Sequence, residues 1–203
     1  MPMTRRLATL AVAVSLAAAL GGCATSSADL SRATVGVYRD TIDLSGKVSV
    51  NYQRDGKSEP SNGNFTWQQR PGAIDVTLAS PLGQTLALIN VTPGAATLTQ
   101  AGQAPRTASD IDSLSQQTLG WPLPVSGLRD WLQGYAIDAQ GKRFRASPAN
   151  NQIVTKDGWR LRFMSWYDET ALQPKPRVIN AELSGAGDIQ NLSIRIFIEP
   201  AGQ

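Results

Sequence analysis

The sequence predicts a mainly β protein: one antiparallel sheet, strongly curved and nearly a barrel, with short helices inserted in its middle. Apolar and polar residues alternate with a period of two through much of residues 39–100 and 158–198, as is typical of half-buried strands. Frequent turn signals divide these stretches into about ten strands. Between residues 107 and 134 the apolar spacing becomes helical. With 203 residues, 41% of them hydrophobic, the chain suits a single domain with a real core.

The first three strands begin after residue 39 and flank a loop expected at residues 57–63, "KSEPSNG". Their alternating apolar positions are Leu44, Val48, Val50, Tyr52, Phe65, Trp67, Ile74, Val76 and Leu78. The fourth strand, "QTLALINV", is apolar on both faces, which predicts that the sheet is covered on both sides there. A short strand at residues 95–100 follows.

A turn of unusual composition, "SPLG" at residues 80–83, joins the third and fourth strands. Ser, Pro and Gly occupy the first, second and fourth places of a type I turn, as that turn prefers. Leu82 stands in the third place, where a polar residue is usual. Because a hairpin tip cannot easily fold this residue back under the sheet, we expect Leu82 to point outward. The alternative is that it plugs the end of the barrel.

Two short amphipathic helices are expected in the middle of the chain. The first has Ser109 as its N-cap, with Asp110 and Asp112 in its first turn. The second has Ser126 as its N-cap and ends at Gly134. Their apolar sides carry Ile111, Leu114, Leu119, Leu128, Trp131 and Leu132. "WPLP" separates the two helices, and its Trp121 and Pro122 either form a hinge or simply pack.

The remaining strands are expected at residues 143–147, 151–157, 158–166, 177–184 and 189–199, with a turn at 185–188. Leu192, Ile194, Ile196 and Ile198 line one face of the last strand. We expect the helices to cover the concave side of the sheet. A curled sheet with a lid of this kind can enclose a cavity for an apolar ligand, although the same residues could fill the core instead.

The composition removes most catalytic chemistry. The chain has no histidine and one cysteine, which excludes His-dependent triads, His- or Cys-built zinc sites and an intrachain disulfide. Two acid pairs, Asp110/Asp112 and Asp168/Glu169, remain as candidates for glycosidase-type chemistry, but they resemble a helix cap and a loop. No phosphate-binding loop is present. We therefore expect no enzyme, no metal and no cofactor.

The N-terminus has the pattern of an export signal. "MPMTRR" is cationic, and the 14 apolar residues that follow are too few to span a membrane. The run ends in "LGGC", which resembles the lipobox of bacterial lipoproteins and implies cleavage before a lipidated Cys23. Ala24 after it favours the outer membrane. The mature chain then carries 17 basic and 16 acidic residues, which removes the support for nucleic-acid binding.

This pattern divides the chain into a signal peptide at residues 1–22, a lipidated N-terminus and flexible tether at 23–38, and one domain at 39–200. Four stretches in order, "FTWQQ", "LASPLGQTLALI", "LGWPLPVSGLRDWLQG" and "GWRLRF", resemble the LolB family of outer-membrane lipoprotein receptors over residues 42–198. Residues 138–156 match it poorly, and "IFIEPAGQ" lacks a tryptophan expected near the family's C-terminus.

The resemblance implies an unclosed antiparallel barrel of eleven strands with a helical lid over a hydrophobic cavity. It also implies a monomer on the periplasmic face of the outer membrane, which accepts triacylated lipoproteins from a periplasmic, LolA-like carrier. The receptor then inserts them into the inner leaflet without catalysis, cofactor or nucleotide. Leu82 occupies the place of the family's membrane-insertion loop.

The candidate cavity and lid residues are those on the apolar faces. They are Val48, Val50, Phe65, Trp67, Ile74, Val76, Leu78, Leu86, Leu88, Ile111, Leu114, Leu128, Trp131 and Leu132. Two other functions stay open at this point: a carrier of free lipid or glycolipid, and a structural envelope lipoprotein with a filled core. Arg143/Arg145 and Arg160/Arg162 could meet an acidic partner, or could be solvated strand faces.

Overall fold

The structure, a computed structural model, describes residues 30–54, 56–119, 123–186 and 189–200. Twelve strands are found in this part of the chain. They are β1 (Ile42–Arg54), β2 (Lys57–Arg70), β3 (Ala73–Ala79), β4 (Thr85–Thr92), β5 (Ala95–Gln100), β6 (Arg106–Ala108), β7 (Tyr135–Ile137), β8 (Arg143–Arg145), β9 (Gln152–Val154), β10 (Arg160–Trp166), β11 (Pro176–Ala186) and β12 (Ile189–Ile198).

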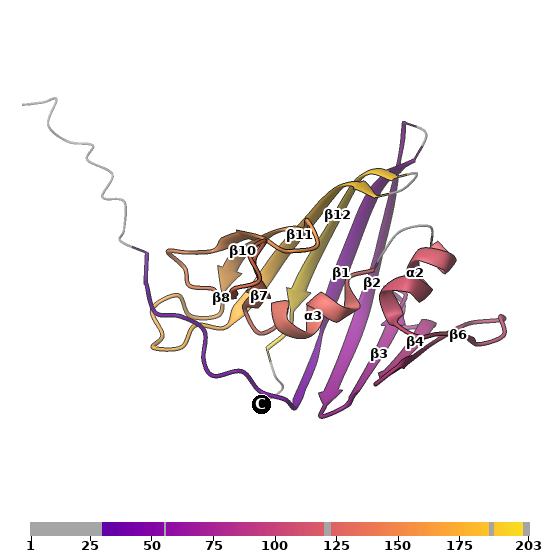
Figure 1. The fold of residues 1–203 in the computed structure, drawn as a ribbon, viewed down its shortest axis with the longest axis horizontal. Helices are drawn as coiled ribbons and strands as arrows, with labels where there is room; N and C mark the ends of the chain where they lie inside the picture. The colour runs from indigo at the N-terminus through magenta and orange to yellow at the C-terminus, as the bar shows by residue number, and fades with distance from the viewer. Residues whose placement is uncertain (1–29, 55, 120–122, 187–188, 201–203) are drawn as a thin grey trace, which may run out of the picture.

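Ten of these strands form one antiparallel sheet in the order β6-β5-β4-β3-β2-β1-β12-β11-β10-β9, and β7 and β8 form a separate pair. The first and last long strands are neighbours at its centre, where Val48 is opposite Ile196 and Val50 opposite Ile194. In the described chain β6 and β9 are the two edges, so the sheet curls without closing (Figure 1). The predicted curved, unclosed sheet is confirmed.

Two helices, α2 (Ile111–Leu119) and α3 (Val125–Trp131), lie over the concave face of the sheet (Figure 1). The core lies between this face, the helices and the β7–β8 pair. Residues that alternate along β12, Leu192, Ile194, Ile196 and Ile198, are all buried, as the period of two predicts. The prediction of helices on the concave side is confirmed.

The helix caps differ from the predicted ones. Asp110, one residue after Ser109, caps α2, since its Oδ1 accepts a hydrogen bond from the Ser113 N–H (2.8 Å). Pro124 precedes α3 and offers no side-chain cap, and Ser126 lies inside the helix. Gly134 ends the helical region as predicted: its N–H donates to the Trp131 carbonyl (2.9 Å), with a φ of +80° that favours glycine.

The loop predicted at residues 57–63 is wrong, because these residues form the first half of β2. Each of them pairs with β1, from Lys57 opposite Arg54 to Gly63 opposite Val48. Pro60 is tolerated because β3 pairs with β2 only from Asn64 onward, so the other side of β2 is free of a ladder there. A long-range partner thus overrides a loop-like local composition.

The prediction that β4 is covered on both faces is also wrong. Ala87 and Ile89 are buried, whereas Leu86 and Leu88 are about half exposed. The sheet has a helical layer on its concave side, and no described element packs on the other face of β4 (Figure 1). Leu86 and Leu88 of β4 are therefore not part of the buried core.

The flexible tether predicted to residue 38 ends earlier in the structure. Val35 is 2% exposed, and its N–H donates to the Ala146 carbonyl (3.0 Å). Its carbonyl accepts a hydrogen bond from Arg145 (2.6 Å). Gly134 packs so closely on Val35 that an added Cβ would approach its Cγ1 to 2.4 Å. Residues 31–38 therefore belong to the domain, because its core provides their partners.

Candidate functional site

A cavity of about 440 Å³ lies between the concave face of the sheet and the two helices. None of the described residues in its wall is charged. The lining residues are Val48, Val50, Tyr52, Ser61, Asn62, Gly63, Asn64, Phe65, Trp67, Val76, Leu78, Ala79, Leu86, Ile89, Thr118, Leu123, Val125, Leu128, Leu132, Ile194 and Ile196. Such an apolar, uncharged wall suits a ligand that is itself apolar.

The structure brings nine of the fourteen predicted cavity residues to this wall. They are Val48, Val50, Phe65, Trp67, Val76, Leu78, Leu86, Leu128 and Leu132. All of them except Leu86 lie either on inward positions of the strands or on the sheet-facing side of the helical lid formed by α2, α3 and the residues directly after α3. Leu86 lies at an irregularity of the β3–β4 ladder, where β4 has one residue more than β3, and it borders the cavity while remaining half exposed.

The other five predicted residues lie elsewhere. Ile74, Ile111 and Leu114 are buried in the core away from the cavity. Trp131 packs edge-on against Trp159, with ring centroids 5.7 Å apart. Leu88 pairs with Thr77 and points to the outer face of the sheet. Periodicity identifies the apolar face of each element, but not which residues on that face border the cavity.

Seven apolar lining residues were missed: Tyr52, Ala79, Ile89, Leu123, Val125, Ile194 and Ile196. The alternation in the last strand had identified Ile194 and Ile196 as one face. Their place in the cavity depends on the pairing of β12 with β1, which no local pattern reveals. Leu123 and Val125 flank Pro124 and carry no periodic signal.

A chain of polar side chains fixes one cavity residue and one end of the lid. The Trp67 Nε1 donates to the Gln69 Oε1 (3.3 Å), and the fully buried Gln69 donates to the Tyr38 hydroxyl (3.0 Å). Arg129 of α3 donates to the same hydroxyl (3.4 Å). Arg143 lies over the Tyr38 ring, with its Cζ 4.8 Å from the centroid. The C-terminal end of α3 is thereby tied to the sheet.

Two hydrogen bonds connect α2 with α3 and with the segment just before it. The Ser126 hydroxyl donates to the Asp112 Oδ2, and the Leu123 N–H donates to the Ser115 hydroxyl oxygen (2.7 Å). Burial raises the pKa of Asp112, although the bond from Ser126 opposes this. Asp110 is different: hydrogen bonds from the Ser113 N–H and hydroxyl lower its pKa. Of the first candidate acid pair, Asp110 thus caps α2 and Asp112 links α2 to α3.

The hairpin between β3 and β4 projects Leu82 into solvent. The Gly83 N–H donates to the Ser80 carbonyl (2.9 Å), which closes the predicted turn, and Gly83 has a φ of +86°. The Ser80 N–H donates to the Gln84 carbonyl (2.8 Å). Leu82 is 91% exposed. The alternative that Leu82 plugs the end of the barrel is therefore excluded.

Other predicted sites have structural roles or lie outside the described residues. Asp168 accepts hydrogen bonds from the Thr170 N–H and hydroxyl (2.9 and 2.8 Å), as in a turn. Arg143 and Arg145 stack on Tyr135. Cys23, Trp121 and Pro122 lie outside the described residues.

In the described chain, no group of three or more acidic or cysteine side chains could hold a metal ion. None of its helices is long and apolar enough to cross a membrane.

The sequence matches the family described as Outer membrane lipoprotein LolB over residues 40–200, which is nearly the whole domain. The chain belongs to the LolB family. This confirms the resemblance seen in the four sequence stretches. It assigns the chain to the lipid-anchored proteins of the outer membrane, with a role in lipoprotein localisation rather than in catalysis.

Relatives within the LolB family cover most of the chain. The Outer-membrane lipoprotein LolB of Cupriavidus metallidurans is 39% identical over 76% of this chain and 78% of its own length. That of Cupriavidus pinatubonensis is 34% identical over 98% and 97%, respectively. Among solved structures, the crystal structure of LolA superfamily protein NE2245 from Nitrosomonas europaea gives a TM-score of 0.42 and 6% identity, covering 78% of this chain and 84% of that chain.

Proposed function

We propose that this protein accepts the acyl chains of lipoproteins from a LolA-like periplasmic carrier and delivers them to the inner leaflet of the outer membrane. The observation that carries the proposal is the mainly apolar cavity under α2 and α3, whose described lining residues carry no charge, with the β3–β4 hairpin at its border. Leu86 of that hairpin lines the cavity, and Leu82 at its tip is exposed. The hairpin thus carries one apolar side chain at the cavity border and another at its exposed tip.

The energetics of the cargo favour direct transfer between protein cavities. A triacylated lipoprotein carries on the order of 45 chain carbons, and burial of each methylene gains about 0.8 kcal/mol. Release into water therefore costs tens of kcal/mol. Passage from one apolar cavity to another and then into a bilayer avoids this cost without bond chemistry or a nucleotide.

The size of the cavity suggests how cargo enters. About 440 Å³ lies near the lower end of the range for small-molecule sites, which is small for three acyl chains. We infer that α2 and α3 move away from the sheet when cargo enters. Cys23 would hold the protein at the membrane through its own lipid, with residues 23–30 as the remaining tether.

Two other functions make different predictions. A structural lipoprotein needs only a filled core, which the cavity argues against. A carrier of free lipid or glycolipid would use the same cavity, and lipid would then co-purify with the protein. The alternatives are distinguished by identifying which cargo is transferred from the carrier to this protein.

The experiment is a transfer assay. Residues 24–203 are mixed with a carrier preloaded with a radiolabelled lipoprotein, the two proteins are separated, and the label is counted. We expect the label to move to this protein. Label that stays with a carrier competent toward its known receptor would contradict the proposal.

A matched pair of variants on α2 tests whether the cavity is the acceptor. Thr118 lines the cavity, whereas its neighbour Gln117 is exposed to solvent. Thr118→Glu places a carboxylate where acyl chains would lie, because a charge is costly in an apolar site. We expect at least a tenfold loss of transferred label for Thr118→Glu and no loss for Gln117→Glu. Equal transfer by both variants would place the cargo elsewhere.

A further inference from the structure

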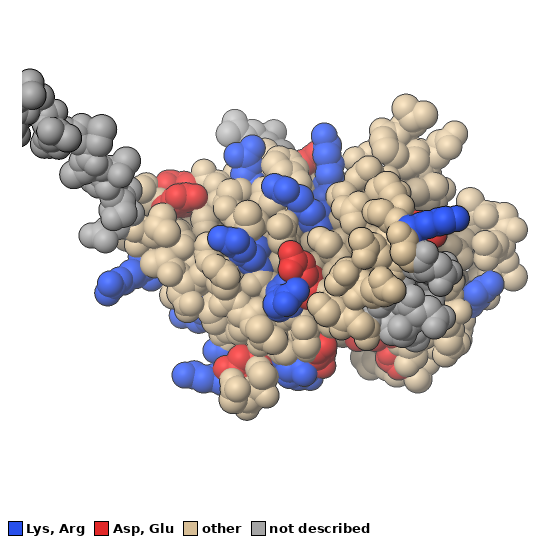
Figure 2. Space-filling model, turned by 90° about the horizontal axis from the view of Figure 1, so that it is seen from above, with Lys and Arg blue, Asp and Glu red and all other residues tan. Residues whose placement is uncertain are grey.

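The part of the sheet from the second half of β3 to the end of β5 carries no charged residue. Between Asp75 and Arg106 lie 30 consecutive residues without a single Asp, Glu, Lys or Arg, although the whole chain is 17% charged and such a stretch would on average carry about five. This segment, residues 76–105, contains most of β3, all of β4 and β5, and the Leu82 hairpin. Figure 2 shows few charged side chains at the end of the molecule where these strands lie.

The β3–β4 hairpin is apolar in three directions. Leu82 is at its tip, Leu86 faces the cavity, and Leu88 lies on the outer face with 47% of its surface exposed. The turn satisfies part of its own backbone, because the N–H groups of Ser80, Gly83 and Gln84 find acceptors within residues 80–84. A hairpin that is uncharged, has exposed leucines on its tip and outer face and has these hydrogen bonds in its turn costs less to place in lipid than a charged or open loop.

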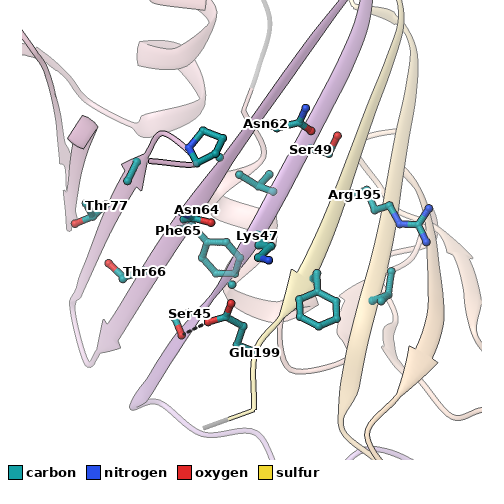
Figure 3. A pocket seen from close by; sticks show the side chains of 17 residues that line it. Ser45, Lys47, Ser49, Asn62, Asn64, Phe65, Thr66, Thr77, Arg195 and Glu199 are labelled. Carbon is teal, nitrogen blue, oxygen red and sulfur yellow. Dashed lines mark hydrogen bonds between the residues drawn. The ribbon is translucent and has the colours of Figure 1, made fainter. Parts of the chain in front are cut away.

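A groove of about 770 Å³ crosses the outer face of the sheet beside this hairpin (Figure 3). At one end it is lined by Thr77 and Pro81 of the hairpin region, and across β1 and β12 it is lined by Lys47 and Arg195. Lys47 is opposite Phe197 and Ser49 opposite Arg195, so the two cations are diagonal neighbours on one face. Neither belongs to the two ion pairs found in the described chain.

Glu199 is the acidic residue of the groove. It lies opposite Ser45, since its N–H donates to the Ser45 carbonyl (2.9 Å) and its carboxylate accepts a hydrogen bond from the Ser45 hydroxyl (3.3 Å), so it is the diagonal neighbour of Lys47 on the side away from Arg195. Asn62 and Ser49 line the groove on the other side of Lys47 (Figure 3). An apolar projection flanked by Lys and Arg is the pattern of proteins that lie on anionic bilayers, with apolar side chains among the acyl chains and cations at the phosphates.

We infer that the outer face of the sheet around the β3–β4 hairpin docks on a phospholipid bilayer, with Leu88 as well as Leu82 in the lipid and with Lys47 and Arg195 on headgroup phosphates. The inference rests on the proposed delivery to the outer membrane and adds how the protein is oriented on that membrane. The hairpin enters over its whole length, with the cavity border at Leu86 brought to the membrane surface.

The test measures depth in the membrane at single positions. The mature lipoprotein, whose only native cysteine carries the lipid, receives one new cysteine as Leu82→Cys, Leu88→Cys or Val154→Cys. Val154 on β9 matches Leu88 in exposure (50%) but lies at the far edge of the sheet. Each thiol is labelled with an environment-sensitive fluorophore, and the protein is reconstituted in phosphatidylethanolamine–phosphatidylglycerol vesicles containing spin-labelled lipid. Cargo transfer by each variant is measured in parallel.

We expect the spin label to quench fluorescence at positions 82 and 88 and not at 154. Lys47→Gln with Arg195→Gln should weaken quenching at position 88 about tenfold on these anionic vesicles, whereas Arg160→Gln with Arg162→Gln should not. Quenching at 82 alone would overturn the inference and leave the proposed function intact. Protection of position 88 by the carrier, without quenching by lipid, would assign this face to the carrier and also overturn it. Loss of cargo transfer in the parent protein would instead count against the proposed function.

Discussion

At the scale of single residues, two leucines of nearly equal exposure occupy very different places. Leu82 is 91% exposed at the tip of the β3–β4 hairpin, and Leu172 is 93% exposed in the loop between β10 and β11. Only Leu82 lies within a long segment without charges, in a hairpin that also carries Leu86 of the cavity wall. An exposed leucine alone is therefore uninformative; its neighbours supply the meaning.

Leu82→Glu is expected to leave cargo acceptance intact and to reduce delivery into liposomes at least tenfold, because a carboxylate resists entry into lipid. Acceptance is measured by label transfer from the carrier, and delivery by label in floated liposomes. Leu172→Glu is the control and should affect neither step. A parallel fall of acceptance and delivery in Leu82→Glu would rule out a role confined to insertion.

At the scale of elements, the lid depends on polar links made by its two short helices. Asp112 of α2 accepts a hydrogen bond from Ser126 of α3, and Arg129 ties the other end of α3 to Tyr38. Short helices of this kind owe their stability to such tertiary contacts more than to propensity. Asp112 and Asp110 lie two residues apart, yet their pKa values move in opposite directions.

Because the two pKa values shift in opposite directions, replacing either aspartate by asparagine should change the free energy of unfolding with opposite signs. Since burial raises the pKa of Asp112, ionised Asp112 lowers the free energy of unfolding at neutral pH, and stability is lost as pH rises through its folded pKa. Asp112→Asn should therefore stabilise the protein at pH 7, with a gain that vanishes below about pH 4. Asn can still accept the hydrogen bond from Ser126. Denaturant unfolding as a function of pH measures the effect.

The matched control is Asp110→Asn. Hydrogen bonds to its carboxylate lower the pKa of Asp110, so the stability it contributes is present at pH 7 and is lost as pH falls through its folded pKa. Asp110→Asn should slightly destabilise the protein at pH 7 and have no effect in acid. A destabilising Asp112→Asn at pH 7 would show that the Ser126 link needs the charge.

At the scale of the whole molecule, the fold brings its first and last strands together. Strand β12 pairs with β1 at the centre of the sheet, and the segment before β1 packs on the β7–β8 region through Val35. The domain therefore begins several residues before its first strand. Removal of this segment would expose core residues, whereas removal of residues 24–29 should be tolerated.

Two valines test this boundary. Val35 is 2% exposed and Val37 is 82% exposed. Val35→Ala should lower the free energy of unfolding by about 2 kcal/mol, through lost burial and the cavity left behind. Val37→Ala should change it by less than about 0.5 kcal/mol. Equal, small effects in denaturant unfolding would return residues 31–38 to the flexible tether.

Local patterns predicted the strands and helices well where one face of an element is buried. The alternation of Leu192, Ile194, Ile196 and Ile198 and the turn at residues 80–83 are both found in the structure. Patterns failed where the partner is distant in sequence. The first half of β2 contains Pro60 and is polar, and it is a strand because β1 pairs with it. The cavity wall shows the same division, since nine residues were predicted and Ile194 and Ile196 were not.

The sequence by itself determined the strand period, the helical insertion, the lack of histidine-dependent chemistry and the family, because these depend on residue types and their local spacing. Only the tertiary structure decided that β12 lies beside β1, that Leu88 faces outward and that Val35 belongs to the core. It also decided which apolar residues enclose an empty volume. Periodicity specifies which side of an element is apolar, whereas the packing of distant elements decides whether that side meets another side chain, a cavity or solvent.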